Sequence, residues 1–190
     1  MAAWRRVKWS EAGQVLAVLG AKEPFPAEAS QPPVAYFNGL VEAERYYEAV
    51  KFLAQALPRL EAVGWAARVV RDIEPKDLDR TRPEAKALRA ALFWLSDPTE
   101  TRRRAASDAT EGCDQTAPEV MAALAAFFSG GSIAPPDCPP LPAPRDAAGR
   151  FAAGAVMLAA ARSSDMQASL LAALNQGAVI AAEGLEAADI

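Results

Sequence analysis

Histidine is missing from this chain of 190 residues. Its absence removes the commonest general base and the commonest zinc ligand, so Ser-His-Asp and Cys-His catalytic arrangements are excluded. Cysteine occurs only at Cys113 and Cys138, and that spacing fits neither a metal-ligand motif nor a thiol pair. A disulfide between them is not favoured. We therefore expect no metal and no cofactor, and an enzyme is the less favoured class of protein.

Long apolar runs are missing as well. The longest, residues 151–161, lies between Arg150 and Arg162 and is 11 residues long, whereas a membrane-spanning helix needs about 20. The charged first residues are not followed by the apolar stretch of a signal peptide. We therefore expect a cytoplasmic protein that does not bind a membrane, with 151–161 as a buried core helix.

Positive charge is in slight deficit, with 20 basic against 24 acidic side chains and a net charge of −4. This balance disfavours binding to a phosphate backbone, so we expect no nucleic-acid partner. The basic residues gather at Arg102-Arg103-Arg104 and in the N-terminal segment Arg5-Arg6-Lys8, which Trp4 and Trp9 flank. The first cluster is interpreted either as a solvated helix face or as a contact for an acidic partner.

Apolar residues at helical spacing fill most of the chain, and no segment alternates long enough to predict a strand. The sequence predicts an all-α fold of seven to nine short antiparallel helices packed as stacked helical hairpins. We treat 1–190 as one domain, with a possible boundary in the proline-rich loop 129–144 that would make 145–190 a helical hairpin. The expected helices are 10–19, 33–57 with a break near Gly39, 59–72, 81–96, 97–112, 120–128, 146–162 and 164–183, with a charged turn at 73–80.

Four helix starts share the capping pattern in which a hydroxyl or carboxylate side chain precedes Glu or Gln by three residues. Each leading side chain is predicted to cap its helix, and the trailing acids Glu84, Glu100 and Glu119 are explained by capping instead of catalysis. The four pairs are Thr81 with Glu84, Asp97 with Glu100, Thr116 with Glu119, and Ser164 with Gln167.

Trp65 and Trp94 fall outside the cleanest apolar stripes of their helices. Exposed tryptophan and arginine are favoured at protein interfaces, so these two residues, with Arg68 and Arg102, are candidate contacts for a partner. The alternative is that both tryptophans belong to a second buried face of a central helix.

The loop 129–144 begins Ser-Gly-Gly-Ser and continues into prolines. A phosphate-binding loop leads into a helix N-terminus, whereas this one leaves a helix, so helix termination is the favoured interpretation. Proline favours extended polyproline geometry, and Pro139-x-x-Pro142 could enter an aromatic groove of a partner or form a rigid connection packed on the body. The candidate contacts in this loop are Ser129, Gly130, Gly131, Ser132, Pro135 and Pro136.

Three segments together resemble an uncharacterised bacterial protein family: Phe52–Ala66 (FLAQALPRLEAVGWA), Trp94 with Asp97-Pro98, and Phe128–Pro136 (FSGGSIAPP). The similarity extends over about residues 34 to 162. It implies an accessory, adaptor or chaperone role beside type VI secretion genes, without an activity that can be transferred. The family pattern has histidine at the position of Gln55 and tryptophan at that of Gly64, so no histidine or aromatic site is carried over.

The leading hypothesis is a non-enzymatic helical adaptor or chaperone-like protein that binds a protein partner. A second hypothesis is a small-ligand or enzymatic site between helices, built from Arg, Asp and one of Tyr36, Tyr46 or Tyr47. A third is a structural protein that forms homo-oligomers through an apolar helix face.

Overall fold

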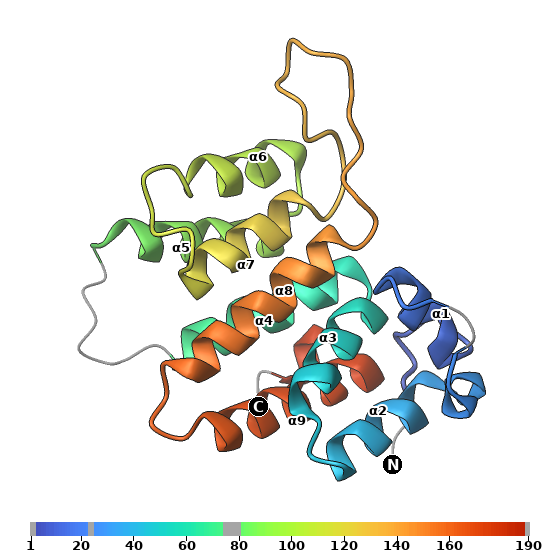
Figure 1. The fold of residues 1–190 in the computed structure, drawn as a ribbon. Helices are drawn as coiled ribbons and strands as arrows, with labels where there is room; N and C mark the ends of the chain where they lie inside the picture. The colour runs from blue at the N-terminus through green and yellow to red at the C-terminus, as the bar shows by residue number, and fades with distance from the viewer. Residues whose placement is uncertain (1–2, 23–24, 74–80, 189–190) are drawn as a thin grey trace.

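The computed structural model describes residues 3–22, 25–73 and 81–188 (Figure 1). These residues form nine α-helices and two short 3-10 helices without a strand, which confirms the predicted all-α fold. The charged turn expected at 73–80 lies, from residue 74 on, outside the described residues. The stacked-hairpin arrangement stays a prediction. The α-helices are α1 (Ala12–Val18), α2 (Pro33–Glu42), α3 (Tyr46–Ala56), α4 (Arg59–Ile73), α5 (Pro83–Ser96), α6 (Glu100–Asp108), α7 (Pro118–Phe127), α8 (Ala147–Ala161) and α9 (Met166–Glu183).

The helices α4 and α8 pack against each other in the middle of the molecule. In Figure 1, α5, α6 and α7 lie on one side of this pair, and α1, α2, α3 and α9 lie on the other. The buried face of α8 consists almost entirely of alanine, with Gly149 and Val156. Because the distance between packed helices depends on the side chains at the contact, small residues let α8 lie against α3, α4 and α7 at once.

The helical region expected at 33–57 is divided into α2 and α3 at a different position from the one predicted. Gly39 lies inside α2, and the break falls at residues 43–45 instead. There Glu44 adopts a left-handed backbone with φ of 57°. This conformation is costly for a residue with a side chain. The chain turns at this residue, between Leu40 of α2 and Val50 of α3, which are both buried in the core.

None of the four predicted capping residues occupies the N-cap position. The caps are Arg82 for α5, Thr99 for α6, Ala117 for α7 and Asp165 for α9, and only Thr99 and Asp165 accept a hydrogen bond through the side chain. The helices nevertheless begin within two or three residues of the predicted caps. Among the described residues, no helix combines the length and apolar character required to cross a bilayer.

Candidate functional site: the proline arm and the basic pocket

Arg103 is buried in α6, where a solvated helix face was one interpretation of the arginine cluster. Its guanidinium donates to both carboxylate oxygens of Glu100, at 2.7 and 2.8 Å, and to the carbonyl oxygens of Phe127 and Ser132. It also lies 4.8 Å from the centre of the Phe127 ring. Arg103 therefore joins the end of α7 to the first residues of the loop that follows it.

Arg104, the next residue of α6, also binds the backbone of this loop. It donates to Glu100 at 2.8 Å, to the Ser132 oxygen at 3.1 Å and to the Ala134 oxygen at 3.0 Å. Hydrogen bonds from Arg103, together with its charge and that of Arg104, lower the pKa of the Glu100 carboxyl from its usual 4.5 to about 2. Glu100 is thus charged at neutral pH and holds both arginines against the loop.

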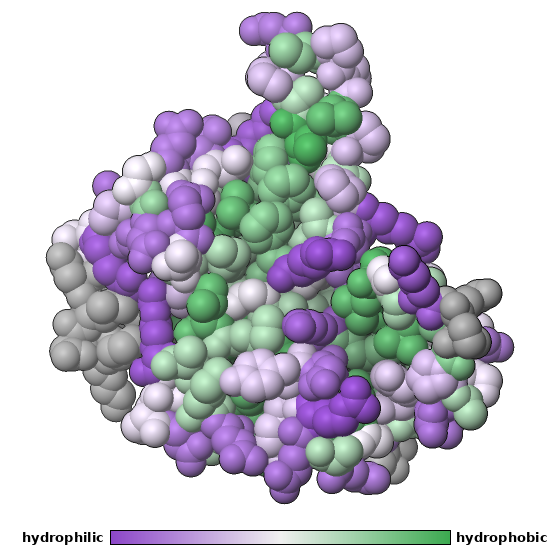
Figure 2. All heavy atoms as spheres, in the orientation of Figure 1, coloured by the Kyte–Doolittle hydropathy of each residue, from purple (hydrophilic) through white to green (hydrophobic). Residues whose placement is uncertain are grey.

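Beyond this anchor the chain projects from the body as a narrow loop, which we call the proline arm and define as residues 132–142 (Figures 1 and 2). Its two sides meet at an isolated bridge between Ser132 and Pro142, with the Ile133 amide donating to the Leu141 oxygen at 2.8 Å. The hydroxyl oxygen of Ser132 accepts from the Leu141 amide at 3.0 Å. Residues 135–142 are all exposed, and Leu141 exposes 55% of its surface.

The arm contains three of the six loop residues expected to contact a partner, and the other three lie just before it. Ser132, Pro135 and Pro136 belong to the arm, while Ser129 and Gly130 follow the end of α7 at half-buried positions. Gly131 has a φ of 62°, and a Cβ there would lie 2.9 Å from a Glu100 oxygen. Glycine is therefore needed where the chain turns past the arginine anchor. The base of the arm is fixed to α6, but the interpretation of this loop as a connection packed on the body is wrong for residues 135–142, which are exposed and project from it.

The expectation that the two candidate tryptophans are exposed is wrong. Trp65 is completely buried and donates from its indole nitrogen to the Ala173 oxygen at 2.8 Å, and Trp94 is also in the core. The alternative interpretation, a second buried face on a central helix, describes both. The helices α4 and α5 are each covered on more than one side, by α7 among others. We therefore omit both tryptophans from the candidate surface.

The other two candidate contacts, Arg68 and Arg102, serve mainly the fold. Arg68 is half-buried and donates to the Leu185 oxygen, which holds the C-terminal 3-10 helix against α4. Arg102 donates to the Phe93 oxygen at 2.9 Å and pairs with Asp97, and so closes the end of α5. Neither side chain is directed to the proline arm by any of these contacts.

Capping does not explain Glu119. Its side chain is fully buried, and one oxygen, Oε1, accepts from Arg82 and from Arg162. Burial raises the pKa of this carboxyl, but the hydrogen bonds from Arg162 and Arg82 outweigh burial and leave the pKa below its usual value. The predicted cap Thr116 instead donates its hydroxyl to Asp114 at 2.7 Å. The arrangement is a buried ion cluster, and within the described residues no group of His, Cys, Asp or Glu could hold a metal.

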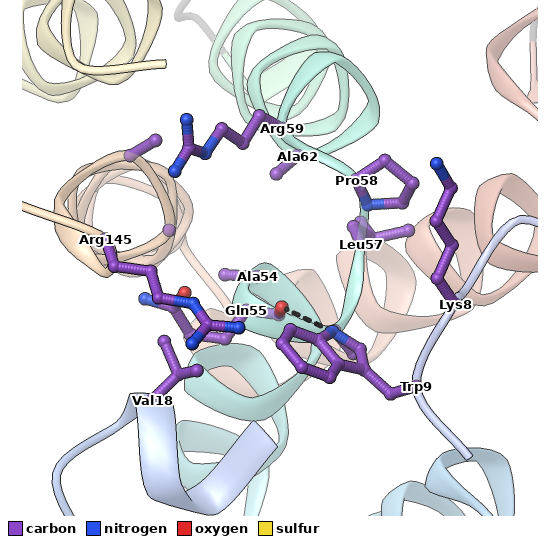
Figure 3. Close-up of a pocket in the computed structure, with 13 residues that line it drawn as sticks. Lys8, Trp9, Val18, Ala54, Gln55, Leu57, Pro58, Arg59, Ala62 and Arg145 are labelled. Atoms are coloured by element: carbon purple, nitrogen blue, oxygen red, sulfur yellow. Dashed lines mark hydrogen bonds between the residues drawn. The ribbon is translucent and has the colours of Figure 1, made fainter. Parts of the chain in front are cut away.

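A pocket of about 300 Å³ lies where the N-terminal segment, the corner between α3 and α4, and the start of α8 meet (Figure 3). Among the described residues that line it, three are cationic, Lys8, Arg59 and Arg145, and none is acidic. The Arg145 guanidinium lies 5.4 Å from the centre of the Trp9 ring, and the indole of Trp9 donates to the Gln55 oxygen at 3.3 Å. We call this the basic pocket.

Gln55 forms part of the pocket wall and is more than nine-tenths buried. Its Nε2 donates to the Asp146 oxygen at 2.7 Å, which ties α3 to the start of α8. A Cβ at position 149 would lie 2.4 Å from the Gln55 amide carbon, so only glycine fits there. The tyrosines of the second hypothesis lie elsewhere: Tyr36 packs on Phe52, and the Tyr47 hydroxyl faces Met166.

The basic pocket was not predicted from the sequence. The clustering of Lys8 beside Trp9, and the position of Arg145 just after the proline-rich loop, are both visible locally. No local pattern predicts that the segments 8–9, 54–62 and 145–149 meet at one place. That meeting depends on α8 packing against α3 and α4.

Comparison with known proteins places the chain in one family. Residues 36–181 match DUF6931, a family of unknown function. The chain belongs to this family. The matched region includes α3 to α8, the proline arm, and the α3–α4 and α8 walls of the basic pocket, but Lys8 and Trp9 precede it. No curated protein and no solved structure matches the chain.

Proposed function

We propose that this member of DUF6931 is a non-enzymatic helical adaptor that binds a protein partner through its proline arm. The single observation that carries the proposal is the combination of a rigid base and an exposed tip. Arg103 and Arg104 hold residues 132–134 by their backbone oxygens, while residues 135–142 are exposed. A partner that binds this arm does not have to order it first, so less entropy is lost on association.

The chemistry of the arm indicates what kind of surface would receive it. Proline fixes φ and lacks an N–H donor, so proline-rich segments are recognised by aromatic grooves instead of by pairing with a strand. Leu141, between Pro140 and Pro142, is the large apolar side chain that the arm exposes most. The partner surface is therefore an aromatic-lined groove that accepts Leu141 and its neighbouring prolines.

The wider setting rests on resemblance. As the resemblance implies, we propose a cytoplasmic bacterial protein that acts as an accessory to a secretion system. The exposed arm supports an adaptor, since it offers a contact surface that projects from the body.

The arm can be tested with two variants matched in chemistry. Leu141→Ser removes an exposed apolar side chain from the arm, and Phe93→Ser removes one that is 64% exposed on α5. Tagged wild-type protein is used to capture a partner, which is then purified and titrated against each form. We expect Leu141→Ser to weaken binding about tenfold or more, as loss of a buried anchor does, and Phe93→Ser to bind as the wild type does.

A second variant replaces residues 135–142 by glycine and serine in equal number and leaves the anchor residues 132–134 in place. It should abolish the complex while the circular dichroism spectrum stays unchanged. The proposal fails if the purified partner binds the replaced protein as tightly as the wild type, or if wild-type protein captures nothing that the replaced protein does not.

A further inference from the structure

Both arginines of the basic pocket lie where the local backbone disfavours a positive charge. Arg59 is the first residue of α4, and Arg145 directly precedes Asp146, the N-cap residue of α8. The N-terminus of a helix carries a partial positive charge, so cations there are unfavourable and anions are favoured. Other helices of this chain follow the rule, with Glu84 in the first turn of α5 and Glu100 in that of α6.

The carboxylates that could offset this charge are engaged elsewhere. Glu61, in the first turn of α4, accepts from Arg6 at 2.7 Å. Asp146 pairs with Arg150 and makes no capping hydrogen bond. Within the described residues the pocket wall therefore combines three cationic side chains with two helix N-termini and no carboxylate. Deviations from local electrostatic rules of this kind are expected at functional sites.

The contacts of the arginines leave donors for a ligand. A guanidinium has five N–H donors, and in the described residues Arg59 makes one hydrogen bond, to the Ser129 oxygen at 2.9 Å. The face of Arg145 lies over Trp9, which orients its edge donors without using them. Figure 3 shows Arg59 above the hollow, Arg145 at its lower left and Trp9 below it. Lys8 lies to the right, beyond Pro58 and Leu57.

Helix geometry adds backbone donors to these side chains. The first N–H groups of a helix have no partner within it, and Ala148 and Gly149, in the first turn of α8, line the pocket. Convergent cations and helix N-terminal amides are the combination that binds oxyanions in proteins.

We propose that the basic pocket binds an oxyanion, a phosphate or carboxylate group of a small ligand, between Arg59, Arg145 and Lys8. A volume of about 300 Å³ lies at the lower end of the range of small-molecule sites. The Trp9 ring forms one wall against which the rest of the ligand lies. This site is separate from the proline arm and does not depend on the adaptor function.

Nuclear magnetic resonance of the tryptophan indoles gives a local readout. The chain has four tryptophans, only Trp9 lines the pocket, and Trp9→Phe assigns its signal. Pyrophosphate and citrate are titrated separately, with sodium chloride at equal ionic strength as the control. We expect a saturable shift of the Trp9 indole signal with at least one of the two anions and none with chloride, while the buried Trp65 and Trp94 signals stay in place.

Charge variants then locate the site. Arg59→Gln and Arg145→Gln should each raise the dissociation constant about tenfold or more, as loss of a charge-assisted hydrogen bond does. Arg71→Gln, at the opposite end of α4, removes the same charge from an exposed position and should leave the constant unchanged. If an arginine variant misfolds, which the Trp65 signal would reveal, Lys8→Gln at an exposed position takes its place.

A response to pyrophosphate alone assigns the site to phosphates, and a response to citrate alone assigns it to carboxylates. The proposal is overturned if neither anion gives a saturable shift, or if Arg71→Gln weakens binding as much as Arg59→Gln. Leu141→Ser should leave the titration unchanged, so failure of the adaptor proposal and failure of this one can be told apart.

Discussion

The carboxylate of Glu119 and the guanidinium of Arg162 lie 2.6 Å apart, although 43 positions separate them in the chain. Arg82 donates to the same oxygen from the N-cap position of α5. One fully buried carboxylate thus joins the start of α5, the first turn of α7 and the end of α8. The cluster therefore adds a polar link between α5 and α8 to the packing of α7 against both helices.

Replacing Glu119 by glutamine should destabilise the protein strongly. The change keeps the size of the side chain but removes the buried carboxylate that Arg82 and Arg162 share, although Arg82 also pairs with Glu84 at 3.8 Å. Loss of one partner of a buried ion pair costs about 3–5 kcal/mol. Because Arg82 and Arg162 keep some contact with solvent, we expect a loss of about 2–4 kcal/mol in the free energy of unfolding. Urea denaturation followed by circular dichroism measures it.

Glu48→Gln is the matched control, because Glu48 pairs with Arg45 at the surface, at 3.4 Å, with both side chains half-exposed. Surface pairs of this kind contribute about 0–1 kcal/mol. An equal loss of stability in the two variants would show that the buried cluster is worth no more than a surface pair.

Acid should weaken the anchor of the proline arm. The folded-state pKa of Glu100 is about 2, below its usual 4.5. A lowered pKa contributes stability that is fully present above the usual value and is lost as the pH falls from 4.5 towards 2. The unfolding midpoint in urea should therefore fall across this interval, and Glu100→Gln should flatten that part of the curve. A curve of unchanged steepness in Glu100→Gln would contradict the assignment.

The positions of the helices follow from the spacing of apolar residues, and this part of the fold was predicted well. The capping residues were not, and proline explains two of the differences. Pro83 and Pro118 occupy the first positions of α5 and α7, and a residue before proline is pushed into extended geometry. Arg82 and Ala117 therefore become the N-caps whatever their side chains, and Thr81 and Thr116 lie one residue too early.

Two features of the candidate site, the burial of Trp65 and the exposure of the proline arm, could not be predicted from local sequence patterns. Trp65 fills the space between α4 and α9, and its burial depends on Gly177 of α9 having no side chain: a Cβ there would lie 2.9 Å from the indole nitrogen. Such complementarity between residues 112 positions apart has no signature near either of them. The exposure of the proline arm was open for a related reason, since prolines alone do not tell whether a loop lies on the body or leaves it.

The fit between Trp65 and Gly177 can be tested by adding one methyl group. Gly177→Ala places a Cβ 2.5 Å from Leu53 Cδ2, and overpacking of a core costs about 1–3 kcal/mol. Gly39→Ala, also inside a helix, meets nothing within 4 Å and should stabilise by about 0.5–1 kcal/mol, as removal of a helix glycine does. Thermal unfolding compares them, and a melting temperature that rises in both variants would contradict the packing described for α9.

Two neighbouring arginines of α6, Arg102 and Arg103, bind the backbone of different segments. Arg103 holds the Phe127 and Ser132 oxygens, whereas Arg102 holds the Phe93 oxygen at the end of α5. Arg103→Gln should therefore loosen the base of the proline arm, and Arg102→Gln should not. Hydrogen exchange of the Ile133 amide, which donates to the Leu141 oxygen at 2.8 Å, reports on the base directly.

We expect that amide to exchange about tenfold faster or more in Arg103→Gln, since loss of a charge-assisted hydrogen bond costs about 1.5–3 kcal/mol and local opening follows local stability. In Arg102→Gln its rate should equal that of the wild type. If the Ile133 amide exchanges equally slowly in both variants, the arm is held by its own bridge between Ser132 and Pro142. Its rigidity would then come from the arm itself and not from the arginine anchor on α6.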